Sequence, residues 1–152
     1  MEQPQLEFAF ELRVEVSALP EIGQTPKGMR RVISIDGGSF GGPHIRGKII
    51  GGGYDWQLRR NDNVSEIEAR YVLQTDDGAM ITIVNAGLRH GPEEVMKALA
   101  EGKEVDPSQY YFRSIPYFET SEVKYDWLNK SIFIASGIRK PTLVIIQVWK
   151  VL

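Results

Sequence analysis

The alternation of apolar and polar residues along the chain predicts a protein built mainly from β-strands. The clearest stretch is 6–16, where Leu, Phe and Val side chains occupy every second position and mostly charged residues lie between them. Residues two positions apart share one face of a strand, so this pattern is typical of a strand with one buried and one solvated face. Shorter patterns of the same kind predict further strands at 29–35, 46–50, 54–58, 66–75, 79–85, 110–115, 131–136 and 142–152.

The residues between these patterns predict turns and one helix. Asp76-Asp77-Gly78 predicts a hairpin turn, because Asp-Gly tolerates the positive φ that tight turns require. A short helical insertion is expected at about 92–101, where a proline and two glutamates suit the first turn and Gly102 suits the stop. We therefore expect a single all-β domain over residues 1–152, an antiparallel β-barrel of about eight to nine strands, with a sandwich as the alternative.

Glycine is concentrated in one part of the chain. Of the 15 glycines, eight lie between residues 37 and 53. Glycine within strand patterns marks bulges, barrel corners or close approach of a ligand to the backbone. We expect the strand at 29–35 to stop at Asp36-Gly37-Gly38 and bends to break the next strand into short pieces. A phosphate-binding loop is not expected, because no helix opening with Lys-Ser/Thr follows these glycines.

Composition and charge remove several classes of function. The chain has 152 residues and no Cys, which excludes a disulfide framework, a thiolate nucleophile and a cysteine zinc site. Two His, at 44 and 90, are too few for a three-histidine metal cage, and we expect no cofactor. The net charge of −2, with scattered Lys and Arg, disfavours a nucleic-acid partner. The apolar runs are too short to span a membrane and the first residues do not resemble a signal peptide, so we expect a cytoplasmic protein.

Several ordered motifs resemble the DUF3237 family, also called UPF0311. This resemblance implies a compact β-barrel and brings no agreed activity. The motifs that carry it cover most of the chain: FELRVEV at 10–16, GGSFGGPHIRGKIIGGGYDWQ at 37–57, ARYVLQTDDGAMITIVNAG at 69–87, YFRSIPYFETS at 111–121 and YDWLNKSIFIASG at 125–137.

Two carboxylates are the candidate catalytic residues. Asp55 follows three glycines, where a ligand can approach the backbone closely, and Glu119 stands among aromatic residues that would raise its pKa. Together they could form an acid–base couple, although a turn-capping Asp and a solvated Glu are the structural alternatives.

The candidate ligand-binding residues are basic, aromatic or amide side chains within the predicted strands and the aromatic segment near residue 127. Arginine is costly to bury unpaired, so a mid-strand Arg is expected either to form an ion pair or to hold an anionic ligand. Aromatic side chains can line a pocket for a flat ligand, but in a small barrel they more often form core. The candidates are Trp56, Arg70, Tyr71, Asn85, Arg113 and Trp127.

Three classes of function remain open. The first is a cofactor-free enzyme that carries out proton transfer, isomerisation, cyclisation or hydrolysis on a small molecule in an apolar, aromatic-lined barrel pocket. The second is a non-catalytic barrel that binds an aromatic or acidic metabolite. The third is a structural protein that forms a homo-oligomer through the edge of its first or last strand. We favour them in that order.

Overall fold

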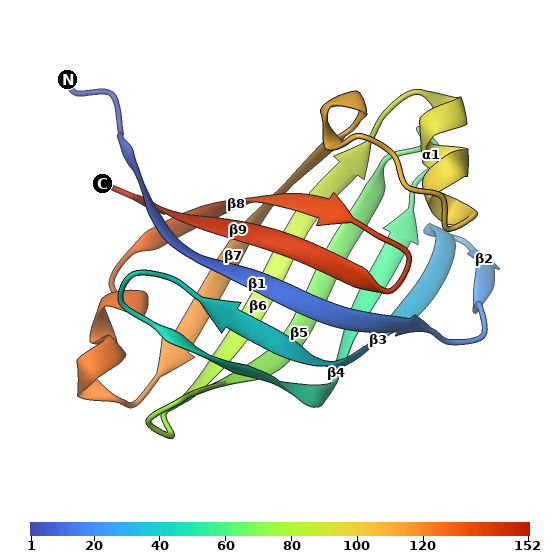
Figure 1. Cartoon of the computed structure of the whole chain (residues 1–152). Coiled ribbons are helices and arrows are strands. Elements are labelled where there is room, and N and C mark those ends of the chain that lie inside the picture. The colour runs from blue at the N-terminus through green and yellow to red at the C-terminus, as the bar shows by residue number, and fades with distance from the viewer.

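A computed structural model describes residues 1–152 and shows a closed antiparallel β-barrel (Figure 1). Eight strands pair in chain order around the barrel, and β1 closes it by pairing with both β3 and β9. A ninth strand, β2, extends the sheet beside β3. The strands are β1 (Leu6–Ala18), β2 (Gly23–Thr25), β3 (Gly28–Gly41), β4 (Arg46–Arg59), β5 (Ser65–Thr75), β6 (Met80–His90), β7 (Tyr111–Thr120), β8 (Ile132–Arg139) and β9 (Leu143–Val151). The prediction of a β-barrel is confirmed.

Closure of the barrel uses the edges of the first and last strands. β1 pairs with β3 on one side and β9 on the other, and β9 pairs with β1 and β8. β9 is paired on both sides over Val144–Val151, and β1 pairs with β3 only from Glu11 onward, so little of either edge is open to a second copy of the chain. The formation of a homo-oligomer stays a prediction.

The glycine-rich segment bends two strands without ending them. β3 continues through Gly37 and Gly38, and β4 is one strand across its three consecutive glycines, so the predicted breaks are wrong. Instead, the pairing register shifts between Ile35 and Gly38 and between Ile50 and Tyr54, as at β-bulges. Gly38 has a φ of 130°, and a Cβ there would lie 2.0 Å from the carbonyl oxygen of Arg13. Only glycine fits this bend.

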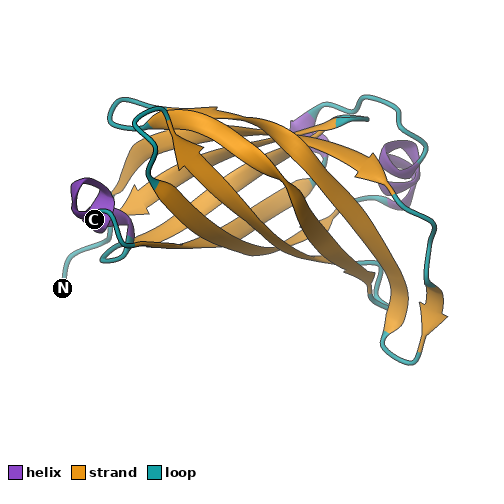
Figure 2. Cartoon of the chain, turned by 90° about the horizontal axis from the view of Figure 1, so that it is seen from below, coloured by secondary structure: helices purple, strands orange, loops and turns teal.

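The helices lie beyond the ends of the strands rather than over the barrel wall (Figure 2). The one α-helix, α1 (Glu93–Ala100), confirms the predicted insertion, and its Leu99 is buried. Two 3₁₀ segments, η1 (Pro107–Gln109) and η2 (Val123–Leu128), accompany it. In Figure 1, α1 and η2 stand at opposite ends of the barrel. No helix has both the length and the apolar character needed to cross a membrane.

One end of the barrel, next to η2, is filled by aromatic side chains, and we call it the closed end. Phe10 packs against Phe40 and Phe118, with ring centres 6.0 and 5.5 Å apart. Phe118 also makes an edge-to-face contact with Phe133 at 5.2 Å. All four rings are buried, which anchors the strands around a continuous apolar core.

The other end of the barrel, next to α1, keeps charged and amide groups inside; we call it the mouth. The buried polar residues here include Asp55, Gln57, Asn85 and Arg89. Burial of such groups costs free energy unless they are paired or serve a ligand, so the mouth is where a functional site is most strongly indicated.

Candidate functional site

Strand alternation places three of the predicted site residues inside the barrel. Asp55 on β4 pairs with Ala69 on β5, and Ala69 pairs with Asn85 on β6, so these three side chains form one row across the inner wall. Tyr71 lies two residues beyond Ala69 and faces inward too. The small Ala69 side chain leaves space between the Asp55 carboxyl and the Asn85 amide.

Asp55 is held in place by two hydrogen bonds and is only 8% exposed. Its Oδ2 accepts a hydrogen bond from Gln57 Nε2 at 2.8 Å, and its Oδ1 accepts one from the Glu68 backbone N–H at 3.0 Å. Burial raises the pKa of Asp55, and the hydrogen bonds oppose this effect only in part. A carboxyl with a raised pKa is suited to taking up and returning a proton. Burial likewise raises the pKa of the neighbouring Tyr71 hydroxyl, so this group stays a neutral donor.

The interior beside Asp55 contains a small chamber that lies against a larger opening. The chamber has a volume of about 40 Å³, and its walls include Asp55, Tyr71 and Asn85 together with apolar residues of β1, β5 and β9. The mouth cavity has a volume of about 600 Å³ and is bordered by α1. Gln57 and Arg89 line both spaces, so a ligand in the mouth can extend one small group toward Asp55.

Buried polar atoms without partners mark the same region. Asn85 Oδ1 accepts no hydrogen bond, and Arg31 Nε and Arg89 Nε donate none. Ser114 Oγ on β7 is also unpartnered. Native proteins leave few buried polar atoms unpaired, and such atoms are often explained by a ligand or water at the site. Three of the four belong to residues that line the chamber or the mouth.

Three arginines that the sequence analysis missed converge on this end of the barrel. Arg31 on β3 pairs with Gln57, which faces inward, and Arg89 is four residues beyond Asn85 on the same face of β6. Arg139 ends β8, and all three line the mouth cavity. Burial lowers the pKa of Arg89 to about 10, with a further contribution from Arg139, so Arg89 stays protonated at neutral pH. Besides burial, the positive charges of Arg139 and Arg31 contribute to the lowered pKa of Arg89, and that of Arg31 to the lowered pKa of Arg139, because like charges lie near one another.

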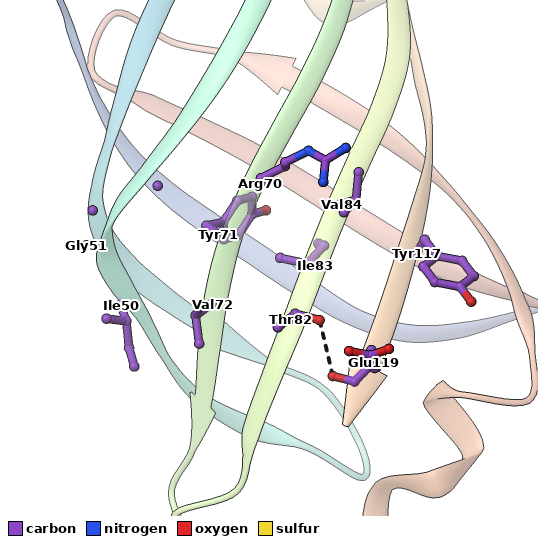
Figure 3. A pocket seen from close by; sticks show the side chains of 12 residues that line it. Ile50, Gly51, Arg70, Tyr71, Val72, Thr82, Ile83, Val84, Tyr117 and Glu119 are labelled. Atoms are coloured by element: carbon purple, nitrogen blue, oxygen red, sulfur yellow. Dashed lines mark hydrogen bonds between the residues drawn. The ribbon is translucent and has the colours of Figure 1, made fainter. Parts of the chain in front are cut away.

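Arg70 and Glu119 lie on the outer surface of the barrel, separated from Asp55 by the wall. Both line a groove of about 550 Å³ that crosses β4 to β7 beside the three glycines of β4 (Figure 3). Arg70 forms an exposed ion pair with Glu68 at 3.3 Å. The expected acid–base couple of Asp55 and Glu119 is therefore not formed, because Glu119 follows the inward-facing Phe118 and must face outward.

The remaining predicted ligand residues also lie away from the chamber. Trp56 is 45% exposed on the outer face of β4. Arg113 is exposed, and its guanidinium lies 5.6 Å from the centre of the Tyr111 ring. Trp127, in η2, packs 6.1 Å from Phe133 at the closed end. No group of three or more His, Asp or Glu side chains is placed to hold a metal ion.

Comparison with known proteins agrees with this fold. The model of the DUF3237 family, described as a protein of unknown function, matches residues 4–151. The chain belongs to the DUF3237 family. It is 40% identical over 145 residues to a UPF0311 protein of Rhodopseudomonas palustris, covering 95% of each chain. A Clostridium acetobutylicum UPF0311 protein is also 40% identical, over 95% of this chain and 92% of the relative.

Solved structures extend the comparison to a more distant protein. The crystal structure of a conserved protein of unknown function from Rhodopseudomonas palustris matches with a TM-score of 0.97 over the full length of both chains, at 36% identity. A Penicillium herquei protein named hydroalkoxylation enzyme phnH is 27% identical over 130 residues, 83% of this chain and 69% of the relative. A structure of an enzyme from the same organism matches at a TM-score of 0.74 and 22% identity, covering 100% of this chain and 97% of that one, which shows a shared fold.

Proposed function

We propose that this DUF3237 protein is a cofactor-free enzyme that adds a hydroxyl group across a carbon–carbon double bond within one small organic substrate, using Asp55 to move the proton. The observation that carries the proposal is the buried Asp55 carboxyl, fixed by two hydrogen bonds at the edge of a chamber that meets a 600 Å³ mouth. The reaction transfers a proton and involves no net oxidation, so it needs no redox cofactor.

The proposed chemistry uses groups on the inner wall only. Ionised Asp55 takes the proton of the substrate hydroxyl, while the hydroxyl oxygen forms a bond to one carbon of the double bond. The electron pair of that double bond moves to the other carbon, or to a carbonyl conjugated with it. Asp55 then returns the proton to the carbon of the former double bond that did not bind the oxygen. This step leaves the enzyme in its original state. Asn85 Oδ1, which has no partner, can accept a hydrogen bond from another donor group of the substrate.

A distant relative supports the choice of reaction. The Penicillium herquei relative is named for hydroalkoxylation, which is the addition of an O–H group across a double bond. That reaction falls within the proton-transfer and cyclisation chemistry that a buried carboxyl in an otherwise largely apolar chamber can carry out. A model compound that carries both reacting groups serves to test this reaction.

A cyclisation assay with 2′-hydroxychalcone tests the proposal. This compound carries a phenol and a conjugated double bond that close to a flavanone, and the loss of conjugation is followed by absorbance. We expect the wild-type protein to accelerate closure over buffer. Asp55→Asn should reduce the enzymatic rate about 100-fold or more, the range typical of losing a general acid–base group. Glu119→Gln, which changes the outer carboxylate, should keep the wild-type rate.

The outcomes separate the open classes of function. Equal rates for Asp55→Asn and wild type would contradict the role of Asp55, and a loss confined to Glu119→Gln would move the site to the outer groove. Tight binding of 2′-hydroxychalcone with no acceleration over buffer would contradict the proposed addition and favour the binding barrel instead.

A further inference from the structure

We infer that Arg31, Arg89 and Arg139 form a binding site for the oxyanion head, a carboxylate or a phosphate, of a small organic ligand that enters the mouth. This inference rests on the proposed function in one respect: it places the ligand in the same cavity as the Asp55 chemistry. It goes further by assigning the class of ligand and the side chains that recognise it.

The three arginines reach the mouth from strands far apart in the sequence, and none of them forms an ion pair there. Arg31 comes from β3, Arg89 from β6 and Arg139 from β8, and all three line the same cavity. No carboxylate lies within 4 Å of any of them, unlike the outer arginines Arg13, Arg60 and Arg70, although other outer arginines such as Arg46 and Arg113 also form no ion pair. Unpaired cations that gather at a partly buried site favour binding of an anion.

Arg89 is the most firmly placed of the three. It is 7% exposed, and its guanidinium carbon lies 5.3 Å from the centre of the Phe112 ring. Gly137 allows this arrangement, because a Cβ there would lie 2.8 Å from the same ring. The ring supports one side of the guanidinium, and Arg89 Nε remains unpartnered beside the chamber.

Guanidinium groups carry the type of donors that an oxyanion requires. Nε and one terminal nitrogen of a guanidinium form a planar fork that pairs with two oxygens of a carboxylate or phosphate. Arg31 and Arg89 both have a free, buried Nε. Arg139 already donates from Nη1 to the Lys140 carbonyl at 2.7 Å, which fixes its position at the rim.

The acidic residues around the mouth do not balance this charge. Glu21, Asp62 and Glu93 line the rim, and Asp62 is held by Arg60 at 2.8 Å. Lys97 and Arg59 add two more cations to the same lining. Asp55 lies in the chamber below and forms no ion pair, so the mouth presents a net positive surface to an entering ligand.

Calorimetric titration with three matched probes tests the inference. Benzoate and phenyl phosphate carry an oxyanion on an aromatic ring, and benzyl alcohol is a neutral analogue. We expect at least one anion to bind the wild-type protein at least tenfold more tightly than benzyl alcohol, and the tighter anion identifies the head group. Arg89→Met and Arg31→Met should each weaken that binding about tenfold or more, while Arg70→Met on the outer surface should not change it.

Thermal unfolding of the ligand-free variants separates a binding role from a structural one. Arg89→Met removes a buried, unpaired charge, so its Tm without ligand should equal or exceed that of wild type. A clear fall in Tm would mean that Arg89 has a structural partner, and it would overturn the assignment of Arg89. Arg31→Met, at a more exposed position, then decides whether the anion site exists at all.

The remaining outcomes distinguish this inference from the proposed function. If benzyl alcohol binds as tightly as both anions, or if Arg89→Met and Arg31→Met both keep wild-type affinity, the anion site is wrong. Chalcone cyclisation that still depends on Asp55 would then leave the proposed function standing. If instead the anion binds through the arginines while Asp55→Asn cyclises at the wild-type rate, only the proposed function fails.

Discussion

The two ends of the barrel shift the pKa of an aspartate in opposite directions. At the closed end, Asp77 sits in the β5–β6 hairpin and accepts hydrogen bonds from Lys124 Nζ at 2.8 Å, from the Tyr125 hydroxyl at 3.0 Å and from the Thr75 hydroxyl. These partners, Lys124 first, hold the pKa of Asp77 well below its ordinary value of 3.8. At the mouth, Asp55 accepts hydrogen bonds from neutral donors, and desolvation raises its pKa more than these bonds and the charges of Arg89 and Arg139 lower it.

Within one sheet, Asp77 contributes to stability, whereas Asp55 is the residue proposed for chemistry. Partners that favour the charged form of Asp77 tie the hairpin to η2 and stabilise the closed end. The raised pKa of Asp55 means that its charged form is disfavoured by folding, a cost that proteins commonly retain at functional sites. The closed end thus supports the fold, and the mouth is free to carry binding and proton transfer.

The largest effect on stability is expected from the aromatic core of the closed end. Phe133 is 1% exposed and packs against Phe118 and Trp127. Phe133→Ala should lower the free energy of unfolding by about 3–5 kcal/mol, because it leaves a cavity that the neighbouring rings cannot fill. Urea denaturation measures this loss. Ile132→Ala, one residue away and 69% exposed, is the matched control and should change stability by less than about 0.5 kcal/mol. Equal effects of the two variants would mean that the closed end is not the stabilising core.

A smaller loss is expected when the charge of Asp77 is removed. Asp77→Asn should lower the Tm at pH 7, because Lys124 and Tyr125 lose a charged acceptor. The pKa of Asp77 is lowered by folding, so its stabilising contribution is present above pH 3.8 and is lost as the pH falls through the lowered value. The Tm difference between variant and wild type should therefore shrink toward acidic pH. The Asp76 side chain makes no hydrogen bond, so Asp76→Asn should have the Tm of wild type. An equal fall in Tm for Asp76→Asn would show that the turn conformation, and not the Asp77 contacts, is responsible.

The smallest and opposite effect is expected at the mouth. The pKa of Asp55 is raised by folding, so the stability linked to this group is full below pH 3.8 and is lost as the pH rises through the raised value. Asp55→Asn should therefore raise the Tm at pH 8 by about 2–4 °C, the shift that corresponds to roughly 1 kcal/mol in a chain of this size. The gain should disappear toward pH 4 in the same thermal scans. A variant that is less stable than wild type at pH 8 would show that charged Asp55 is well paired.

Strand alternation was enough to predict the barrel and part of the site. The pattern at 6–16, the Asp76-Asp77-Gly78 turn and the helix near 92–101 all reflect local rules of periodicity and turn chemistry, and the structure has each of them. The same alternation placed Ala69 and Tyr71 on one face and Arg70 on the other. Followed through, it predicts that the Arg70 side chain points outward while the Tyr71 side chain points inward.

The arginines of the mouth were missed because strand ends are hard to locate from sequence. The strand predicted at 79–85 continues to His90, which puts Arg89 on the inward face with Asn85. The strand predicted at 131–136 likewise continues to Arg139. Arg31 lies within a strand that the sequence predicts. It shares the strand face of the buried Ile33 and Ile35, and this was the signal that Arg31 points inward. Closure of the barrel brings the side chains of the three strands to one opening. A local sequence pattern cannot predict this closure.

The most direct test of the account is a carbon-13 NMR titration of the aspartate carboxyl groups, with the Asp55 and Asp77 resonances assigned from Asp55→Asn and Asp77→Asn. The account predicts that Asp55 titrates above its ordinary pKa of 3.8 and Asp77 below it, in the same sample. If Asp55 titrates at or below 3.8, its charged form is stabilised by the fold. It would then be a structural acceptor like Asp77, and the proposed proton transfer at the mouth would be wrong.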